Sequence, residues 1–179
     1  MTEKETLSVS MRDLMPVVIE QLENGQIVSL KIKGVSMQPY LMDEKDSIFM
    51  VSPQGHTPKL GDLFMFRRKD GSYAMHRLSR KNNDGTYDFV GDNQFVPDCG
   101  LTNQQLVAYV PNAIRNGKKI SCEKGFLRFY MIQRMLFRRD HPKTAQRIIR
   151  IRFYISLFLH NPTKIFGWLR KKLGRKKHE

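Results

Sequence analysis

Short runs of apolar residues, each followed by a turn signal, dominate residues 27–110. The runs are IVSLKI, DSIFMV, DLFMFR, SYAMHRL, TYDFV and LVAYV. Turns containing Gly, Pro, Asn or Asp lie between them, namely PQG, KDG, NNDG and PDCG. Short apolar runs bounded by such turns are typical of β-strands. The pattern therefore predicts a small antiparallel β-fold and gives no sign of a parallel sheet.

A different spacing precedes the first of these runs. In residues 11–24, MRDLMPVVIEQLEN, apolar side chains recur at the interval of a helix, at Leu14, Val17, Val18 and Leu22. Gly25 follows, which suits a helix that ends in a left-handed residue. Because proline has no backbone N–H, we expect Pro16 to lie in the first turn. This segment is predicted to be a short amphipathic helix.

From residue 121 onward the apolar runs are long enough for helices. The three segments are GFLRFYMIQRMLFRR, TAQRIIRIRFYISLFLH and PTKIFGWLRKKLG. Asp140-His141-Pro142 and Asn161-Pro162 separate them, each a capping residue ahead of an early proline. The longest uncharged stretch, residues 153–163, is well short of the roughly 20 residues that span a bilayer. The fold class we expect is therefore mainly β, with a short N-terminal helix and a basic α-helical C-terminal tail.

The net charge of +14 is distributed unevenly along the chain. Residues 1–120 hold 15 Lys and Arg against 14 Asp and Glu, whereas residues 121–179 hold 16 against 3. This segregation predicts a boundary near Ser121, between a nearly neutral domain, residues 1–120, and a basic attachment segment, residues 121–179.

Three roles for this tail remain open. Basic residues mixed with Phe, Tyr, Trp and Leu favour binding to an anionic membrane surface, where the aromatic rings enter the interface. The same mixture could neutralise nucleic-acid phosphates, which we weigh as the weaker alternative. In the third role the apolar side chains pack on the domain and the charges face solvent.

Cysteine and histidine spacing argues against a metal site. Cys99 and Cys122 have no metal-type spacing, and none of the five histidines lies three to five residues from another. Residues 1–26 include acidic residues and no apolar block of signal-peptide length. We therefore expect a cytoplasmic protein without signal peptide or transmembrane helix, peripheral at the inner face of the membrane.

One turn carries candidate chemistry, in KGVSMQPYLMDEKD, residues 33–46. Gly34 lies two residues before Ser36 and Pro39 lies three after it. Glycine permits close approach of the backbone and proline fixes the exit of the turn, so Ser36 can present its hydroxyl and its N–H at one point. Taken alone, the pattern also fits a serine that only shapes the turn.

Four motifs in order make the interpretation more specific. GVSMQP, GDLFMF, MHRL and GDNQFVPD together resemble the signal peptidase I family, in particular its serine–histidine branch of archaea and the endoplasmic reticulum. The resemblance covers about residues 27–111. It implies the β-fold shared by signal peptidases and self-cleaving repressors.

The resemblance also implies roles for individual residues. Ser36 matches the nucleophile and His76 the general base. Asp92 and Asp98 match a pair of aspartates, either of which could orient the imidazole. We favour Asp98, because Asp92 in a Gly-Asp-Asn turn can bond its own backbone. A neutral histidine with a pKa of about 6.5 accepts a proton near neutral pH, and a neighbouring carboxylate would raise that pKa.

The oxyanion and substrate site would comprise Ser36, Gly34 and Met37. Gly34 has no side-chain hydroxyl, so the oxyanion would be bound by backbone N–H groups. Met37 is expected to pack beneath the nucleophile, near the leaving-group side.

The implied activity is that of a serine endopeptidase that cleaves a signal, leader or precursor peptide after small residues, without a cofactor. Two other functions remain open. A self-cleaving repressor would need lysine at position 76 and an internal cut site before Ser36. A non-catalytic adaptor would keep the fold and bind peptide or nucleic acid, and it would be favoured if Ser36 and His76 do not come within hydrogen-bond reach. The sequence also departs from the family: we expect no membrane anchor in residues 1–35, where the family has one before the serine, and Lys45-Asp46 stands where Gly-Asp is usual.

Overall fold

The computed structural model describes residues 10–160, with side chains up to residue 151. The N-terminal helix is α1 (Met11–Glu23). Eight strands follow: β1 (Val28–Lys31), β2 (Ser47–Val51), β3 (Leu63–Arg67), β4 (Tyr73–Lys81), β5 (Tyr87–Val90), β6 (Asp98–Leu101), β7 (Leu106–Arg115) and β8 (Lys118–Ser121). A 3₁₀ turn, η1 (Asn103–Gln105), precedes β7, and two helices complete the described chain, α2 (Phe126–Asp140) and α3 (Pro142–His160).

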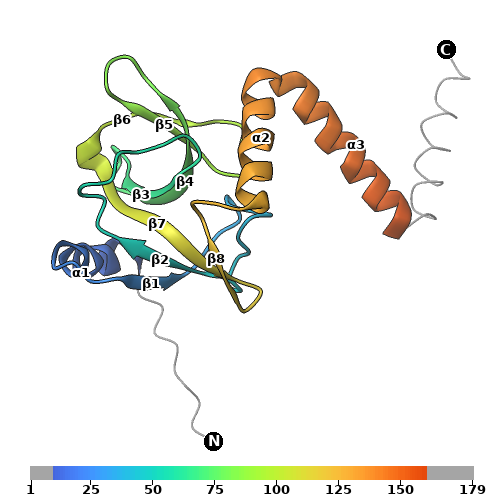
Figure 1. The fold of residues 1–179 in the computed structure, drawn as a ribbon. Helices are drawn as coiled ribbons and strands as arrows, with labels where there is room; N and C mark the ends of the chain where they lie inside the picture. The colour runs from blue at the N-terminus through green and yellow to red at the C-terminus, as the bar shows by residue number, and fades with distance from the viewer. Residues whose placement is uncertain (1–9, 161–179) are drawn as a thin grey trace, which may run out of the picture. The chain divides into compact units, whose positions relative to one another are not determined.

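The strands form one sheet in the order β1-β2-β7-β3-β4-β5-β6, and β8 pairs with β7 outside this path. Every pairing is antiparallel. Figure 1 shows that β4 is strongly curved, and that α1 lies beside β1 and β2. The prediction of a mainly β, antiparallel fold is confirmed, and each of the six apolar runs contributes a strand.

Helix α1 has sequence signals at both ends. The Ser10 side chain accepts the N–H of Asp13, and the N–H groups of Gly25 and Gln26 bond back to the last turn, with Gly25 at φ 75°. The expected place of Pro16 was wrong, because the helix begins at Met11 and Pro16 therefore lies in the second turn. Burial of Met15, Val18 and Leu22 stabilises the helix despite the missing N–H donor.

Two strands were not predicted. PDCG was expected to be a turn, but Asp98 begins β6, where a register shift against β5 accommodates Gly100 at φ 70°. Strand β8 follows a tight turn in which Asn116 and Gly117 both have positive φ. An Asn-Gly pair is a strong hairpin signal, so this strand could have been found from the sequence.

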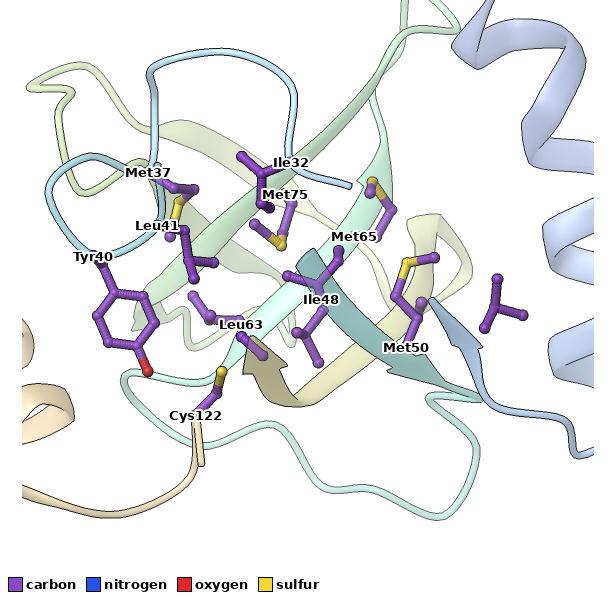
Figure 2. Close-up of a cluster of buried hydrophobic side chains, with 14 of the residues drawn as sticks. Ile32, Met37, Tyr40, Leu41, Ile48, Met50, Leu63, Met65, Met75 and Cys122 are labelled. Atoms are coloured by element: carbon purple, nitrogen blue, oxygen red, sulfur yellow. The ribbon is translucent and has the colours of Figure 1, made fainter. Parts of the chain in front are cut away.

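The core has two parts. An aromatic cluster contains Phe64, Phe66, Phe89 and Tyr109. The larger cluster is rich in methionine and includes residues of the loop between β1 and β2. Figure 2 shows Met37, Tyr40 and Leu41 directed from this loop into that cluster. The segment that carries Ser36 is therefore fixed by its own buried neighbours.

The chain divides into two compact units, residues 1–136 and residues 137–179. The boundary near Ser121 between a nearly neutral domain and a basic segment stays a prediction. Met131 of α2 belongs to the methionine-rich core, so this part of the helix packs with the sheet. Helices α2 and α3 cover the first two predicted tail helices, and the third lies outside the described residues. Within residues 10–160, no helix combines the length and apolar character needed to cross a membrane.

Candidate active site

Ser36 lies half-buried in the loop between β1 and β2. The next residue, Met37, is 2% exposed and belongs to the methionine-rich core. Before the serine, Gly34 takes a φ of 99°, and its N–H donates to Asp43 Oδ1 at 2.7 Å. This N–H is therefore already bonded within the loop. Among the described residues, the Ser36 N–H has no hydrogen-bond acceptor.

The end of the loop is tied to the sheet by a buried carboxylate. Asp46 is fully buried and accepts the N–H of Met42 at 2.7 Å and of Asn116 at 3.0 Å. Arg115 donates to the carbonyl of Tyr40 at 2.9 Å. The aspartate of the Lys45-Asp46 pair is thus an anchor of the loop, a role that its sequence context did not indicate.

The Gly-Asp-Asn turn holds the Ser36 loop from the other side. Asn93 donates its backbone N–H to the Ser36 carbonyl at 2.7 Å and its side-chain amide to the Val35 carbonyl at 3.3 Å. A Cβ on Gly91 would lie 2.7 Å from that Ser36 oxygen. Only glycine fits this approach without a shift of the backbone. The two sequence motifs are therefore in direct contact.

His76 lies on β4 with 2% of its side chain exposed. Its Nδ1 bonds Asp98 Oδ2 at 2.8 Å. A neutral ring bonded in this way carries its proton on Nδ1, so Nε2 is left as the acceptor. The Phe66 ring packs edge-on against the imidazole at 5.8 Å between centroids. Of the two candidate aspartates, Asp98 is therefore the one that binds the histidine.

Arg68 is a member of this cluster that sequence reasoning missed. Its Nε bonds Asp98 Oδ1, and its Nη2 donates to Asp98 Oδ2 at 3.0 Å. The guanidinium thus holds the carboxylate by both oxygens while His76 occupies one of them. Arg68 follows strand β3 in a basic Arg-Arg-Lys stretch, which gives no sign of this contact.

Asp92 has a different partner. It accepts two hydrogen bonds from Arg77, at 2.9 Å from Nε and 2.8 Å from Nη2, and both side chains are buried. Arg77 also donates to the Gly61 carbonyl at 2.9 Å and lies over the Tyr40 ring. Asp92 is therefore part of an internal ion pair that joins β4 to the Gly-Asp-Asn turn.

Burial and the neighbouring charges shift the pKa values of the pair. Burial lowers the pKa of His76 below 6.5, and the Arg68 charge lowers it too, although the Asp98 contact opposes both. Burial alone would raise the pKa of Asp98, but its bonds to Arg68 and His76 outweigh that effect and lower it. Our expectation of an upward shift at His76 was wrong because burial is the larger effect. At neutral pH the ring is neutral and the carboxylate is ionised.

Ser36 and His76 line one cavity of about 280 Å³. Its wall is mixed: Leu30, Ile32, Ile48, Met65 and Met75 contribute apolar side chains, and Lys31, Lys33, Arg68 and Gln94 contribute polar or charged ones. Among the described residues, no hydrogen bond joins the Ser36 hydroxyl to the His76 ring. The two side chains thus line the same space without a direct hydrogen bond. Catalytic hydrogen bonds are often long in ligand-free enzymes and tighten when substrate binds.

No group of three or more His, Cys, Asp or Glu residues that could hold a metal ion occurs in the described part of the chain. Comparison of the sequence with models of known protein families finds no match, and neither does comparison with curated proteins.

Proposed function

We propose that this protein is a serine endopeptidase of the signal peptidase I type, with Ser36 as nucleophile and His76 as general base. The observation that carries the proposal is the shared cavity. Ser36 and His76 line it together, and Asp98 holds the ring so that Nε2 is the accepting nitrogen. Nucleophile, base and orienting carboxylate are the groups that acyl transfer through serine requires.

The proposed cleavage reaction uses Ser36 and His76 in the following steps. The Ser36 oxygen attacks the carbonyl carbon of the scissile bond while its proton passes to His76 Nε2. The negative oxygen of the tetrahedral intermediate is bound by the Ser36 N–H. His76 then gives its proton to the leaving amine, the C–N bond breaks, and an acyl-enzyme remains. Water attacks the ester with His76 again as base, which releases the acid product and regenerates Ser36.

The substrate would bind as an extended peptide. Strand β1 stands at one end of the sheet order, and its residues Leu30 and Lys31 line the cavity. An edge strand offers free main-chain donors and acceptors to a peptide. The apolar part of the wall, which includes Ile48 and Met75, would take a small apolar side chain on the acyl side of the cut bond, and a signal, leader or precursor peptide would provide one.

A non-catalytic peptide-binding adaptor is the second candidate, because Ser36 and His76 make no direct hydrogen bond within the described residues. A serine-directed fluorophosphonate probe separates the two. An activated Ser36 forms a covalent adduct, and mass spectrometry should locate it on the peptide that contains residue 36. The adduct should be absent from Ser36→Ala and present in Ser52→Ala. Labelling that persists in Ser36→Ala would exclude Ser36 as nucleophile, and an unlabelled wild-type protein would favour the adaptor.

The pH dependence of cleavage tests the cluster around Asp98. Because His76 must be neutral and its pKa is lowered, kcat/KM should rise with pH to a plateau through a midpoint below 6.5. The Arg68 charge lowers this pKa, so Arg68→Gln should move the midpoint upward, whereas Arg68→Lys retains the charge and should move it less. Asp98 raises the pKa, so Asp98→Asn should move the midpoint downward. Shifts in the same direction for Arg68→Gln and Asp98→Asn would contradict this arrangement.

A further inference from the structure

Helix α2 is docked on the sheet by one face. Met131 is 1% exposed in the core, and the Ile132 side chain fills the space where a Cβ on Gly61 would lie. Arg128 donates to Asp62 Oδ1 at 3.1 Å and to the Leu60 carbonyl at 3.2 Å. These contacts fix the orientation of this part of the helix, so its opposite face has a defined direction.

The opposite face is apolar too. Phe126, Phe129 and Tyr130 are 82%, 58% and 46% exposed. Phe129 and Tyr130 lie three and four residues after Phe126, so each of them neighbours the Phe126 ring on the helix surface. A surface helix normally carries polar side chains on the side away from the core. Three adjacent exposed aromatic rings therefore indicate a partner for this face.

The charge of the residues next to α2 in the sequence indicates which kind of partner this face binds. Lys118, Lys119 and Lys124 are exposed just before α2. From residue 121 onward the sequence holds 16 Lys and Arg and only 3 Asp and Glu. Aromatic rings flanked by basic residues match a surface that offers negative charge outside and an apolar phase beneath it.

We propose that the outer face of α2, formed by Phe126, Phe129 and Tyr130, inserts into the headgroup region of an anionic membrane. The docked inner face then holds the sheet, and the cavity with it, next to the lipid surface. Nucleic acid would attract the same charges, but phosphates offer no apolar phase for three rings on a convex helix. This proposal does not depend on peptidase activity.

Vesicle binding by the full chain tests it. Vesicles of phosphatidylcholine with phosphatidylserine should bind the protein, with weaker binding at high salt, and vesicles of phosphatidylcholine alone should bind it poorly. Phe126→Ser/Phe129→Ser should weaken binding about tenfold or more, since each ring loses its transfer from water. Ile27→Ser removes a side chain that is 68% exposed elsewhere and should leave binding unchanged. Equal loss in the control, or no loss in the double variant, would overturn the proposal.

A fluorescence measurement avoids dependence on the stability of the double variant. Phe126→Trp is made with Trp168→Phe, so that the chain again contains a single tryptophan. Insertion predicts a blue shift of the emission on addition of phosphatidylserine vesicles. An unshifted spectrum with bound vesicles would show that α2 does not enter the lipid. Tight binding to single-stranded DNA combined with no binding to vesicles would assign the surface to nucleic acid instead.

Discussion

Ser36→Ala and His76→Ala are each expected to lower kcat/KM for peptide cleavage by roughly a thousandfold or more. Without the hydroxyl no acyl-enzyme forms, and without the imidazole the hydroxyl keeps its proton at the moment of attack. Because the two side chains act as one unit, the double variant should be scarcely slower than either single variant. The measurement is steady-state cleavage of a peptide with alanine before the cut bond.

The effect of each substitution on the stability of the protein must be separated from its effect on the rate of cleavage. His76 is buried and bonds Asp98, so His76→Gln is a useful companion that keeps a polar group of similar size. Thermal unfolding of each variant shows whether it is folded at the assay temperature. Ser52→Ala and His141→Ala change the same residue types elsewhere and should retain full activity. Substantial cleavage by folded His76→Ala would contradict the assignment of the base.

The strands could be predicted because local patterns fix them. Alternation of buried and half-buried residues in β2, and turn residues between the runs, are properties of short segments. Strand β6 has no such pattern, since Asp98, Cys99 and Gly100 are poor strand formers. It forms because β5 is already in place to pair with it. Its assignment needs knowledge of the neighbouring strand.

Part of the candidate site could also be predicted from local patterns, because its residues lie in short sequence motifs. Ordered motifs located Ser36, His76 and the two aspartates, and the structure brings Ser36, His76 and Asp98 to one region. Their catalytic roles remain a prediction. Which aspartate meets the ring depends on strand register, and the Arg68 contact joins residues 30 positions apart. Contacts across that distance leave no local signal in a single sequence.

The Gly-Asp-Asn motif has a structural role that mutagenesis can separate from catalysis. Asp92 and Arg77 form a buried ion pair, and removing one partner takes away the opposite charge that the other faces in the interior. Loss of one member of such a pair costs about 3–5 kcal/mol of unfolding free energy, whereas apolar replacement of both members is often nearly neutral. A loss of activity in Asp92→Asn can therefore come from lower stability, so the stability of this variant has to be measured together with its activity.

Arg77→Met and Asp92→Leu should each lower the free energy of unfolding in urea by about 3–5 kcal/mol, and Arg77→Met/Asp92→Leu should recover most of that loss. The matched control is Arg80→Met, since Arg80 is exposed on the same strand and its replacement should change stability by less than about 1 kcal/mol. The paired variant leaves the Gly61 carbonyl without the Arg77 donor, so recovery should be incomplete. Single variants as stable as Arg80→Met would mean that the Arg77–Asp92 pair does not hold the turn. In that case a loss of cleavage in Asp92→Asn would have to be assigned to catalysis.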